Sequence, residues 1–333
     1  IFNEPINSSF KMAWIVPVLV IPVFGVLLYI FVQMQFQTKL LARRLRSTIK
    51  STAPYLNQDM AVQEKIRRSS QRSSHLIDYM KDYAGYPVYE NTSVEYFPLG
   101  EDKFEALKRE LRAARHFIFM EYFIVERGYM WDSILEILEE KVKEGVEVRL
   151  LYDSMGCRGR KGMHKADWDR LRKAGIQVAE FFPALLGQLQ LRVNYRNHRK
   201  IVVIDGRIAY VGGINVGKEY ISKDPKFGYW RDTHLKISGG AVYSLQIRFA
   251  LDWNYATGEN LFKEARYFGD EAEYITRRLK GEWTPVWPDP ERVNELVSMQ
   301  IITSGPDTNE PHIRNNYLEL FHKAKHHIYI HTP

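Results

Sequence analysis

Apolar and polar positions along residues 101–182 switch repeatedly between helical and strand periodicity. Three segments repeat their apolar residues every three to four positions, as helices that bury one face do. The apolar segments between them are shorter and richer in β-branched and aromatic residues, which favours strands. The expected helices cover 101–115, 132–143 and 165–173, and the expected strands cover 117–125, 146–152 and 176–182. Because helices and strands alternate, the pattern predicts an α/β layer sandwich.

A further strand is expected at residues 201–204, which are apolar on both faces, as in a strand buried at the centre of a sheet. Asp205 and Gly206 follow as a tight-turn signal. Residues 208–211 then return as the second strand of a hairpin.

Near the start of the chain, residues 12–32 form a run of 21 residues without a charge. As one helix this run would span about 31 Å, close to the hydrocarbon core of a bilayer. Its two prolines are tolerated in lipid, and Trp14 and Tyr29 lie near its ends, where interfacial aromatic residues belong. We therefore expect a transmembrane helix within an anchor at 1–38. A secretory signal is the competing interpretation, but the run is too long and its positive charge follows it.

The basic charge of the chain lies directly after this run. Lys and Arg total 47 against 40 Asp and Glu, a net charge of +7, and residues 39–72 alone contain nine basic and two acidic residues. A nucleic-acid-binding protein carries its positive charge across the binding domain, so this distribution argues against nucleic acid. The cluster predicts a cytoplasmic location for the rest of the chain, at the face of an anionic membrane. Residues 39–95 are expected to be a basic juxtamembrane linker.

The segment around residues 198–215 carries the candidate chemistry. His198 and Lys200 are two residues apart before a strand, so they share one face and present a nucleophile beside a cation, which suits attack on a phosphodiester. Asp205 is an odd number of residues from His198 and Lys200, so its side chain points to the opposite face, and it is expected to brace the turn. Gly213 lets the backbone approach a phosphate closely, and the Asn215 amide can donate to it.

A nucleophilic histidine needs a partner that fixes its tautomer, and Asp232 is the candidate for His198. Taken alone, a histidine near a lysine is more often an ordinary surface pair. The combination of His-x-Lys-x4-Asp, a buried strand and Gly-Gly-x-Asn favours a catalytic site. Cys157 is the only cysteine, is interpreted as a small buried apolar residue, and provides neither a disulfide nor a cysteine-based zinc site. No metal and no cofactor are expected.

A short internal repeat joins two distant parts of the chain. Ala114, His116 and Ile118 match, at a fixed offset of 210, three residues of the same types: Ala324, His326 and Ile328. The match predicts that a second copy of the domain begins near residue 310. We therefore expect a first domain at 96–280 and, at 281–333, a linker and the start of a second domain.

These residues resemble the bacterial cardiolipin synthases of the phospholipase D superfamily. The resemblance covers nearly the whole chain and is carried by the hydrophobic run and by the blocks MEYFI at 120–124, His198 to Tyr220, WRDTH at 230–234, DWN at 252–254 and IYIHTP at 328–333. It implies a phospholipase D-like α/β/α sandwich and metal-free phosphatidyl transfer through a phosphohistidine. By this resemblance His198, Lys200 and Asp205 form the catalytic motif, Lys200, Gly213 and Asn215 hold the phosphate, and Asp232 orients His198.

The resemblance also implies two facing copies of the motif, so the chain is interpreted as the N-terminal part of a longer protein with a second half in cis or in a homodimer. The expected substrate is phosphatidylglycerol in the bacterial cytoplasmic membrane, and the expected products are cardiolipin and glycerol. Two alternatives stay open. One is a phospholipase D-type phosphodiesterase that uses water as the acceptor, and the other, for the fragment alone, is an inactive half-domain that binds membrane lipid.

Overall fold

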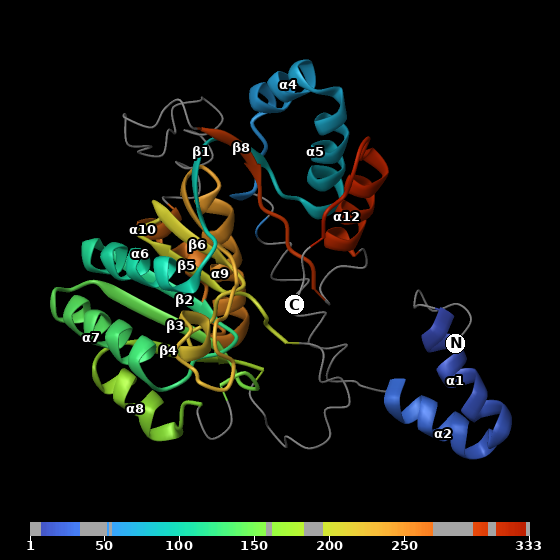
Figure 1. Ribbon diagram of the computed structural model, residues 1–333, viewed down its shortest axis with the longest axis horizontal. Coiled ribbons are helices and arrows are strands. Elements are labelled where there is room, and N and C mark those ends of the chain that lie inside the picture. The colour runs from blue at the N-terminus through green and yellow to red at the C-terminus, as the bar shows by residue number, and fades with distance from the viewer. Residues whose placement is uncertain are drawn as a thin grey trace.

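The computed structural model describes residues 8–33, 52, 55–157, 162–182, 196–268, 296–305 and 311–330. Its central feature is an eight-stranded mixed sheet in the order β4-β3-β2-β5-β6-β7-β1-β8 (Figure 1). Strands β2, β3 and β4 run parallel, and every other neighbouring pair is antiparallel. The strands are β1 (Val88–Phe97), β2 (Phe117–Tyr122), β3 (Glu147–Asp153), β4 (Gln177–Phe181), β5 (Ile201–Ile204), β6 (Ile208–Gly212), β7 (His234–Gly239) and β8 (Val297–Gln300).

Helices cover both faces of this sheet, which confirms the predicted α/β layer arrangement (Figure 1). Helices α6, α7 and α8 cover one face, and α9 with the short α10 covers the other. The helices of this region are α6 (Gly100–Ala113), α7 (Tyr129–Lys143), α8 (Lys165–Lys173), η2 (Lys218–Ile221), α9 (Val242–Thr257), η3 (Leu261–Lys263) and α10 (Ala265–Phe268). Three further helices are not part of these two layers: α4 (Met60–Ser69), α5 (Gln71–Ala84) and α12 (His312–Lys323).

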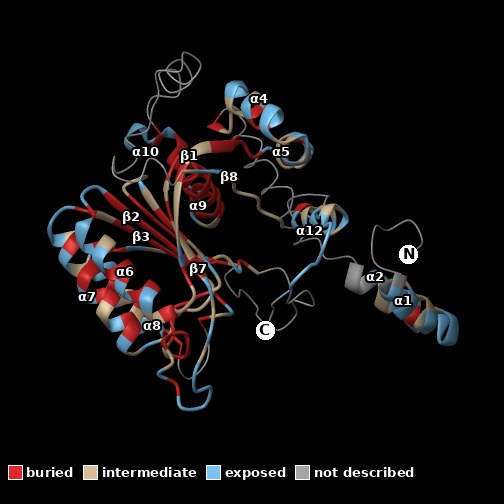
Figure 2. Cartoon of the chain, turned by 45° about the horizontal axis from the view of Figure 1, so that its top comes forward, coloured by how far each residue is buried: buried red, intermediate tan, exposed pale blue. Residues whose placement is uncertain are grey.

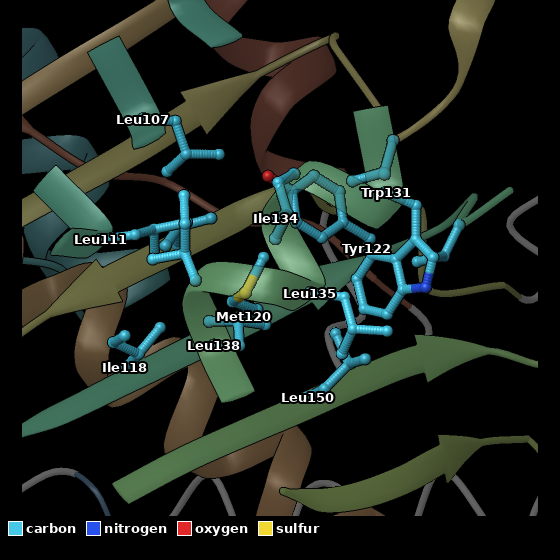
Figure 3. Packing of buried hydrophobic residues seen from close by; sticks show 14 of the residues in the cluster. Leu107, Leu111, Ile118, Met120, Tyr122, Trp131, Ile134, Leu135, Leu138 and Leu150 are labelled. Carbon is cyan, nitrogen blue, oxygen red and sulfur yellow. The ribbon is translucent and has the colours of Figure 1, made fainter. Parts of the chain in front are cut away.

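Two hydrophobic cores lie on the two sides of the sheet because strand side chains alternate. In β2, Ile118 and Met120 pack against α6 and α7, where Figure 3 shows them among leucines of both helices. Phe119 points to the opposite core and stacks on Phe249 of α9, with ring centroids 4.6 Å apart. Both cores stand out as the buried centre of the chain in Figure 2. Cys157 is buried, as expected.

The predicted bounds are most accurate for a helix that buries one face and for a strand that is fully buried. Helix α8 and strand β5 have the expected bounds. Strand β2 ends at Tyr122, earlier than the expected residue 125, and the backbone N–H of Ile124 turns to the side chain of Asn215. Strand β1 begins within the expected linker and pairs with β7, so the sheet includes residues on both sides of that boundary.

The apolar run near the start of the chain forms two helices where one was expected. Helix α1 covers Ser8–Val20 and α2 covers Pro22–Gln33, with the break at Ile21. A residue before proline is disfavoured in helical conformation, and proline is well suited to the first position of a helix, so Pro22 accounts for the break. Among the described residues, no helix reaches the length and apolarity needed to cross a bilayer.

The two helices pack as a hairpin. The ring of Trp14 in α1 meets that of Tyr29 in α2 edge-on, with centroids 5.5 Å apart. A Cβ on Gly25 would lie 2.5 Å from the carbonyl oxygen of Pro17, so only glycine permits this close approach of the backbones. The hairpin leaves large apolar side chains exposed, among them Leu19, Val20 and Val23.

Helix α12 ends in the same way as α6. In both helices an alanine with extended backbone follows the last turn: Ala114 donates to the carbonyl of Leu111, and Ala324 donates to that of Phe321, each at 3.3 Å. Beyond α6 the chain enters β2, which is fully buried. Beyond α12 the chain carries exposed apolar side chains, of which Tyr329 is 87% accessible.

Candidate active site

His198 lies on the segment 196–200 that leads into β5, and its side chain is exposed. The imidazole packs against the ring of Phe123, with centroids 4.6 Å apart. Partial burial, together with the nearby charge of Lys200, holds the pKa of His198 below its ordinary value. The neutral ring is the form that can act as a nucleophile, so this environment favours the reactive state near neutral pH.

Lys200 lies beside His198 and is only 3% exposed. Its Nζ donates a 2.6 Å hydrogen bond to the backbone carbonyl of His198 and lies 5.3 Å from the centroid of the Phe123 ring. Burial lowers the pKa of Lys200 to about 8, although the charges of Asp232 and Asp153 oppose this shift. The structure therefore brings the predicted nucleophile and the predicted cation together around one aromatic ring.

Asp205 lies at the other end of β5 and contacts backbone groups. Its carboxylate accepts hydrogen bonds from the backbone N–H groups of Arg115, His116 and Phe117, each at 2.8 Å. Asp205 and Gly206 both have positive φ, at 53° and 65°, as hairpin turns of the primed types require. This geometry ties the hairpin turn to the start of β2, which is the bracing role expected from the sequence.

The glycine pair at the end of β6 makes room for two side chains, one at the start of β7 and one just before it. A Cβ on Gly212 would lie 2.6 Å from Nδ1 of His234, and one on Gly213 would lie 2.0 Å from Oδ1 of Asp232. The backbone N–H of Gly213 is engaged by the carbonyl of Thr233 at 2.9 Å. The glycines are therefore required for close approach within the protein, and phosphate binding at Gly213 stays a prediction.

Asn215 is buried, and both ends of its amide have partners within the chain. Oδ1 accepts from the N–H of Ile124 at 3.0 Å, and Nδ2 donates to the Tyr220 hydroxyl at 2.6 Å. Asp232 accepts from the N–H of Thr233 at 2.7 Å, and its charge acts on Lys200. The expected contacts of Asn215 with phosphate and of Asp232 with His198 stay predictions.

Comparison with known proteins shows which families match this part of the chain. Residues 107–225 match the family described as cardiolipin synthase, PLD-like domain, and residues 1–33 match the family described as phospholipase D-nuclease N-terminal. Cardiolipin synthase 2 of Staphylococcus epidermidis is 35% identical over 341 residues, covering 100% of this chain and 65% of that protein. The major cardiolipin synthase of Bacillus subtilis is 36% identical over 339 residues, covering 100% and 66%. Residues 107–225 therefore form a cardiolipin synthase-type PLD-like domain.

The chain spans about two thirds of the length of these curated relatives, slightly less in each case. Among solved structures, NucT from Helicobacter pylori is similar with a TM-score of 0.39 and 17% identity, covering 50% of this chain and 98% of that one.

Residues that the sequence did not single out hold the segment of His198 in this cardiolipin synthase-type domain. The buried Asn197 donates from its backbone N–H to the Asp153 carboxylate at 3.0 Å and from Nδ2 to Oε1 of Glu121 at 2.5 Å. Arg199 donates to Asp252 of α9 at 3.0 Å. The available signal was the position of Asn197 and Arg199 immediately on either side of His198.

The pKa shifts predict a window of pH for turnover by the full-length protein. Neutral His198 accumulates as the pH rises through its pKa, which lies below 6.5, and the Lys200 ammonium is lost above about pH 8. Turnover should therefore rise on the acid side and fall above about pH 8. In the Lys200→Arg variant the cation persists, so the alkaline decline should move to higher pH although the rate is lower. If turnover of Lys200→Arg declined at the same pH as turnover of the parent, a group other than Lys200 would cause the decline.

Proposed function

We propose that this chain forms part of a membrane-anchored phosphatidyltransferase, a cardiolipin synthase that joins two phosphatidylglycerol molecules and releases glycerol. The observation that supports this most directly is the exposed imidazole of His198 beside the Lys200 ammonium, within a domain of the cardiolipin synthase family. An accessible nucleophile next to a fixed cation suits the attack on an anionic phosphodiester.

The reaction proceeds in two displacements. A ring nitrogen of His198 attacks the phosphorus of one phosphatidylglycerol, a P–N bond forms, and the bond to the headgroup glycerol oxygen breaks; that oxygen takes a proton and leaves as glycerol. The hydroxyl of a second phosphatidylglycerol then attacks the phosphorus, gives up its proton, and the P–N bond breaks to yield cardiolipin. Lys200 and Asn215 hold the phosphate oxygens, Gly213 leaves room for the phosphate to approach the backbone, and Asp232 orients the imidazole.

A second phospholipase D-like half, in cis or from a homodimer, completes the site. In-line displacement places the entering and leaving groups on opposite sides of phosphorus, so a second histidine is needed to protonate the leaving glycerol. The matching ends of α6 and α12, at the offset of 210, support the start of a second copy near residue 310. The exposed apolar residues after α12, Ile328 to Ile330, are the ones that such a copy would bury in its own sheet.

The α1–α2 segment seats the protein in the bacterial cytoplasmic membrane, with the catalytic domain on the cytoplasmic face. Its exposed apolar side chains and the aromatic pair of Trp14 and Tyr29 support this placement, as does the match of residues 1–33 to an N-terminal family of phospholipase D-type proteins. The basic cluster at 39–50, which sets the expected orientation, lies outside the described residues.

The test is product analysis. Full-length protein is incubated with phosphatidylglycerol vesicles, and lipids and water-soluble products are both measured. We expect cardiolipin and glycerol in equal amounts. Phosphatidic acid as the sole lipid product would overturn the synthase proposal in favour of a phospholipase D-type phosphodiesterase. Vesicle binding without any turnover would instead identify a lipid-binding protein.

A further inference from the structure

Two buried carboxyl groups meet behind the segment that carries His198. Glu121 on β2 is 1% exposed, and Asp252 on α9 is fully buried. The two carboxyl groups lie within reach of each other, and no N–H or O–H donor among the described residues bonds to Oε2 of Glu121. A hydrogen bond between two carboxyl groups needs a proton on one of them, because two ionised carboxylates in contact repel each other.

The surrounding charges decide which group carries the proton. Arg199 and Arg248 both donate to Asp252, with Nε of Arg248 at 2.9 Å, and their charges hold the pKa of Asp252 below its ordinary value although burial opposes this. Burial and the neighbouring Asp252 charge raise the pKa of Glu121 well above its ordinary value. Glu121 is therefore the carboxylic acid of the pair and Asp252 the carboxylate.

The pair reaches His198 through the residues on both sides of it. Oε1 of Glu121 accepts the side-chain amide of Asn197 at 2.5 Å, and Asp252 accepts the guanidinium of Arg199 at 3.0 Å. Asn197 and Arg199 are also linked, by a 3.2 Å bond from the Arg199 N–H to Oδ1 of Asn197. The backbone of His198 is thus fixed at the residue before it and at the residue after it.

We propose that Glu121 and Asp252 form an acid–carboxylate pair whose function is to position His198 for attack on phosphorus, Glu121 acting through Asn197 and Asp252 through Arg199. Both are positioning residues, since neither reaches the phosphate. The inference rests on the proposed function, in which His198 is the nucleophile. Its specific content is that Glu121 works in the protonated form, as a donor to Asp252 and an acceptor from Asn197.

The physical reason is the exposure of the imidazole. Among the residues that the structure describes, no hydrogen bond holds the imidazole of His198, which rests on the ring of Phe123, so its placement depends on its backbone. A displacement of about 1 Å in a reacting group can cost about 100-fold in rate. A rigid buried pair behind the segment supplies the accuracy that the exposed ring lacks.

The test compares two substitutions of Glu121 in the full-length protein. Glu121→Gln preserves the geometry of a protonated acid, because its amide donates to Asp252 and its carbonyl accepts from Asn197, so we expect kcat within about threefold of the parent. Glu121→Ala removes both bonds, and we expect a loss of about 100-fold in kcat with little change in KM. Asn197→Ala cuts the link while leaving the acid pair in place, and it should reproduce the kcat loss.

A second readout follows His198 itself and needs no turnover. Modification by diethyl pyrocarbonate, mapped by mass spectrometry, should proceed faster at His198 in Glu121→Ala than in the parent or in Glu121→Gln, relative to the exposed His116 in the same sample. The matched control is Glu147→Ala. Glu147 is a largely buried carboxylate at the start of β3 that pairs with Arg149, and its removal should change neither kcat nor the modification rate of His198.

The outcomes separate this inference from the proposed function. If Glu121→Gln is as inactive as Glu121→Ala, an ionised Glu121 is required and the inference is wrong. If Glu121→Ala and Asn197→Ala keep full kcat, positioning through Glu121 is also excluded. If the parent makes no cardiolipin but the reactivity of His198 still rises in Glu121→Ala and not in Glu121→Gln, the proposed function fails while the positioning role stands. Thermal unfolding shows whether Glu121→Ala folds. If it does not fold, the kcat values of Glu121→Gln and Asn197→Ala still test the inference.

Discussion

Replacement of His198 by alanine is expected to lower cardiolipin formation by at least about 1,000-fold, because the covalent route through phosphohistidine is lost. Binding of the protein to phosphatidylglycerol vesicles should survive. His198 is exposed and its ring contacts Phe123, so its removal leaves the cores and the hydrogen bonds of the segment intact. The measurements are initial rates of cardiolipin release and co-sedimentation with vesicles.

His164 provides the matched control for this experiment. It is also exposed, and it lies at the start of α8, where its ring meets the guanidinium of Arg127 at 2.8 Å. His164→Ala should weaken the start of that helix slightly and leave the rate of cardiolipin formation within about twofold. Equal losses of turnover in both variants would contradict the assignment of His198 as the nucleophile. Loss of vesicle binding together with turnover in His198→Ala would indicate a role in folding.

Substitution of Asp205 by alanine is expected to destabilise the domain by about 2–4 kcal/mol. Three backbone N–H donors, from Arg115, His116 and Phe117, lose their shared carboxylate. Alanine at φ 53° adds backbone strain, since residues other than glycine, asparagine and aspartate rarely adopt this region. For a domain of this size the loss corresponds to a decrease in Tm of about 5–15 °C, measured by thermal unfolding.

Asp205→Asn separates the two contributions of this residue. Asparagine tolerates positive φ and retains one acceptor, so it should lose about half as much stability as alanine. Below the unfolding transition both variants should keep most of their turnover, because the carboxylate contacts backbone at the start of β2. A loss of turnover above about 100-fold with unchanged Tm would show that Asp205 acts in the chemistry instead.

The parts of the fold that the sequence predicted well are those with local signals. Helix α8 lies between a capping residue, His164, and the positive-φ Gly175 shortly after its end, and its bounds agree with the prediction. The hairpin at Asp205 and Gly206 follows from two residues that accept positive φ. In such places the residues themselves restrict the backbone, so no distant partner is needed to specify the structure.

Other elements depend on partners that are remote in the chain. Strand β1 is rich in polar residues around Asn91 and Thr92, and it becomes a strand because β7 and β8 pair with it from positions far along the sequence. In α9 the pair Arg248 and Asp252 has the i,i+4 spacing of a surface ion pair, yet both residues are buried. The apolar run at 12–32 has no charge to divide it, but the backbone breaks at Ile21 because Pro22 restricts its conformation.

The sequence by itself determined the α/β class, the hairpin that follows β5 and the proximity of His198 to Lys200, because all three arise from spacing within a few residues. Only the tertiary structure decided that Asp205 binds the backbone at the start of β2, that the two glycines make room for His234 and Asp232, and that Glu121 and Asp252 lie behind the nucleophile. These contacts join segments that are separated by 19 to 131 residues along the chain. Their protonation states depend on burial and on charges that the fold alone brings together.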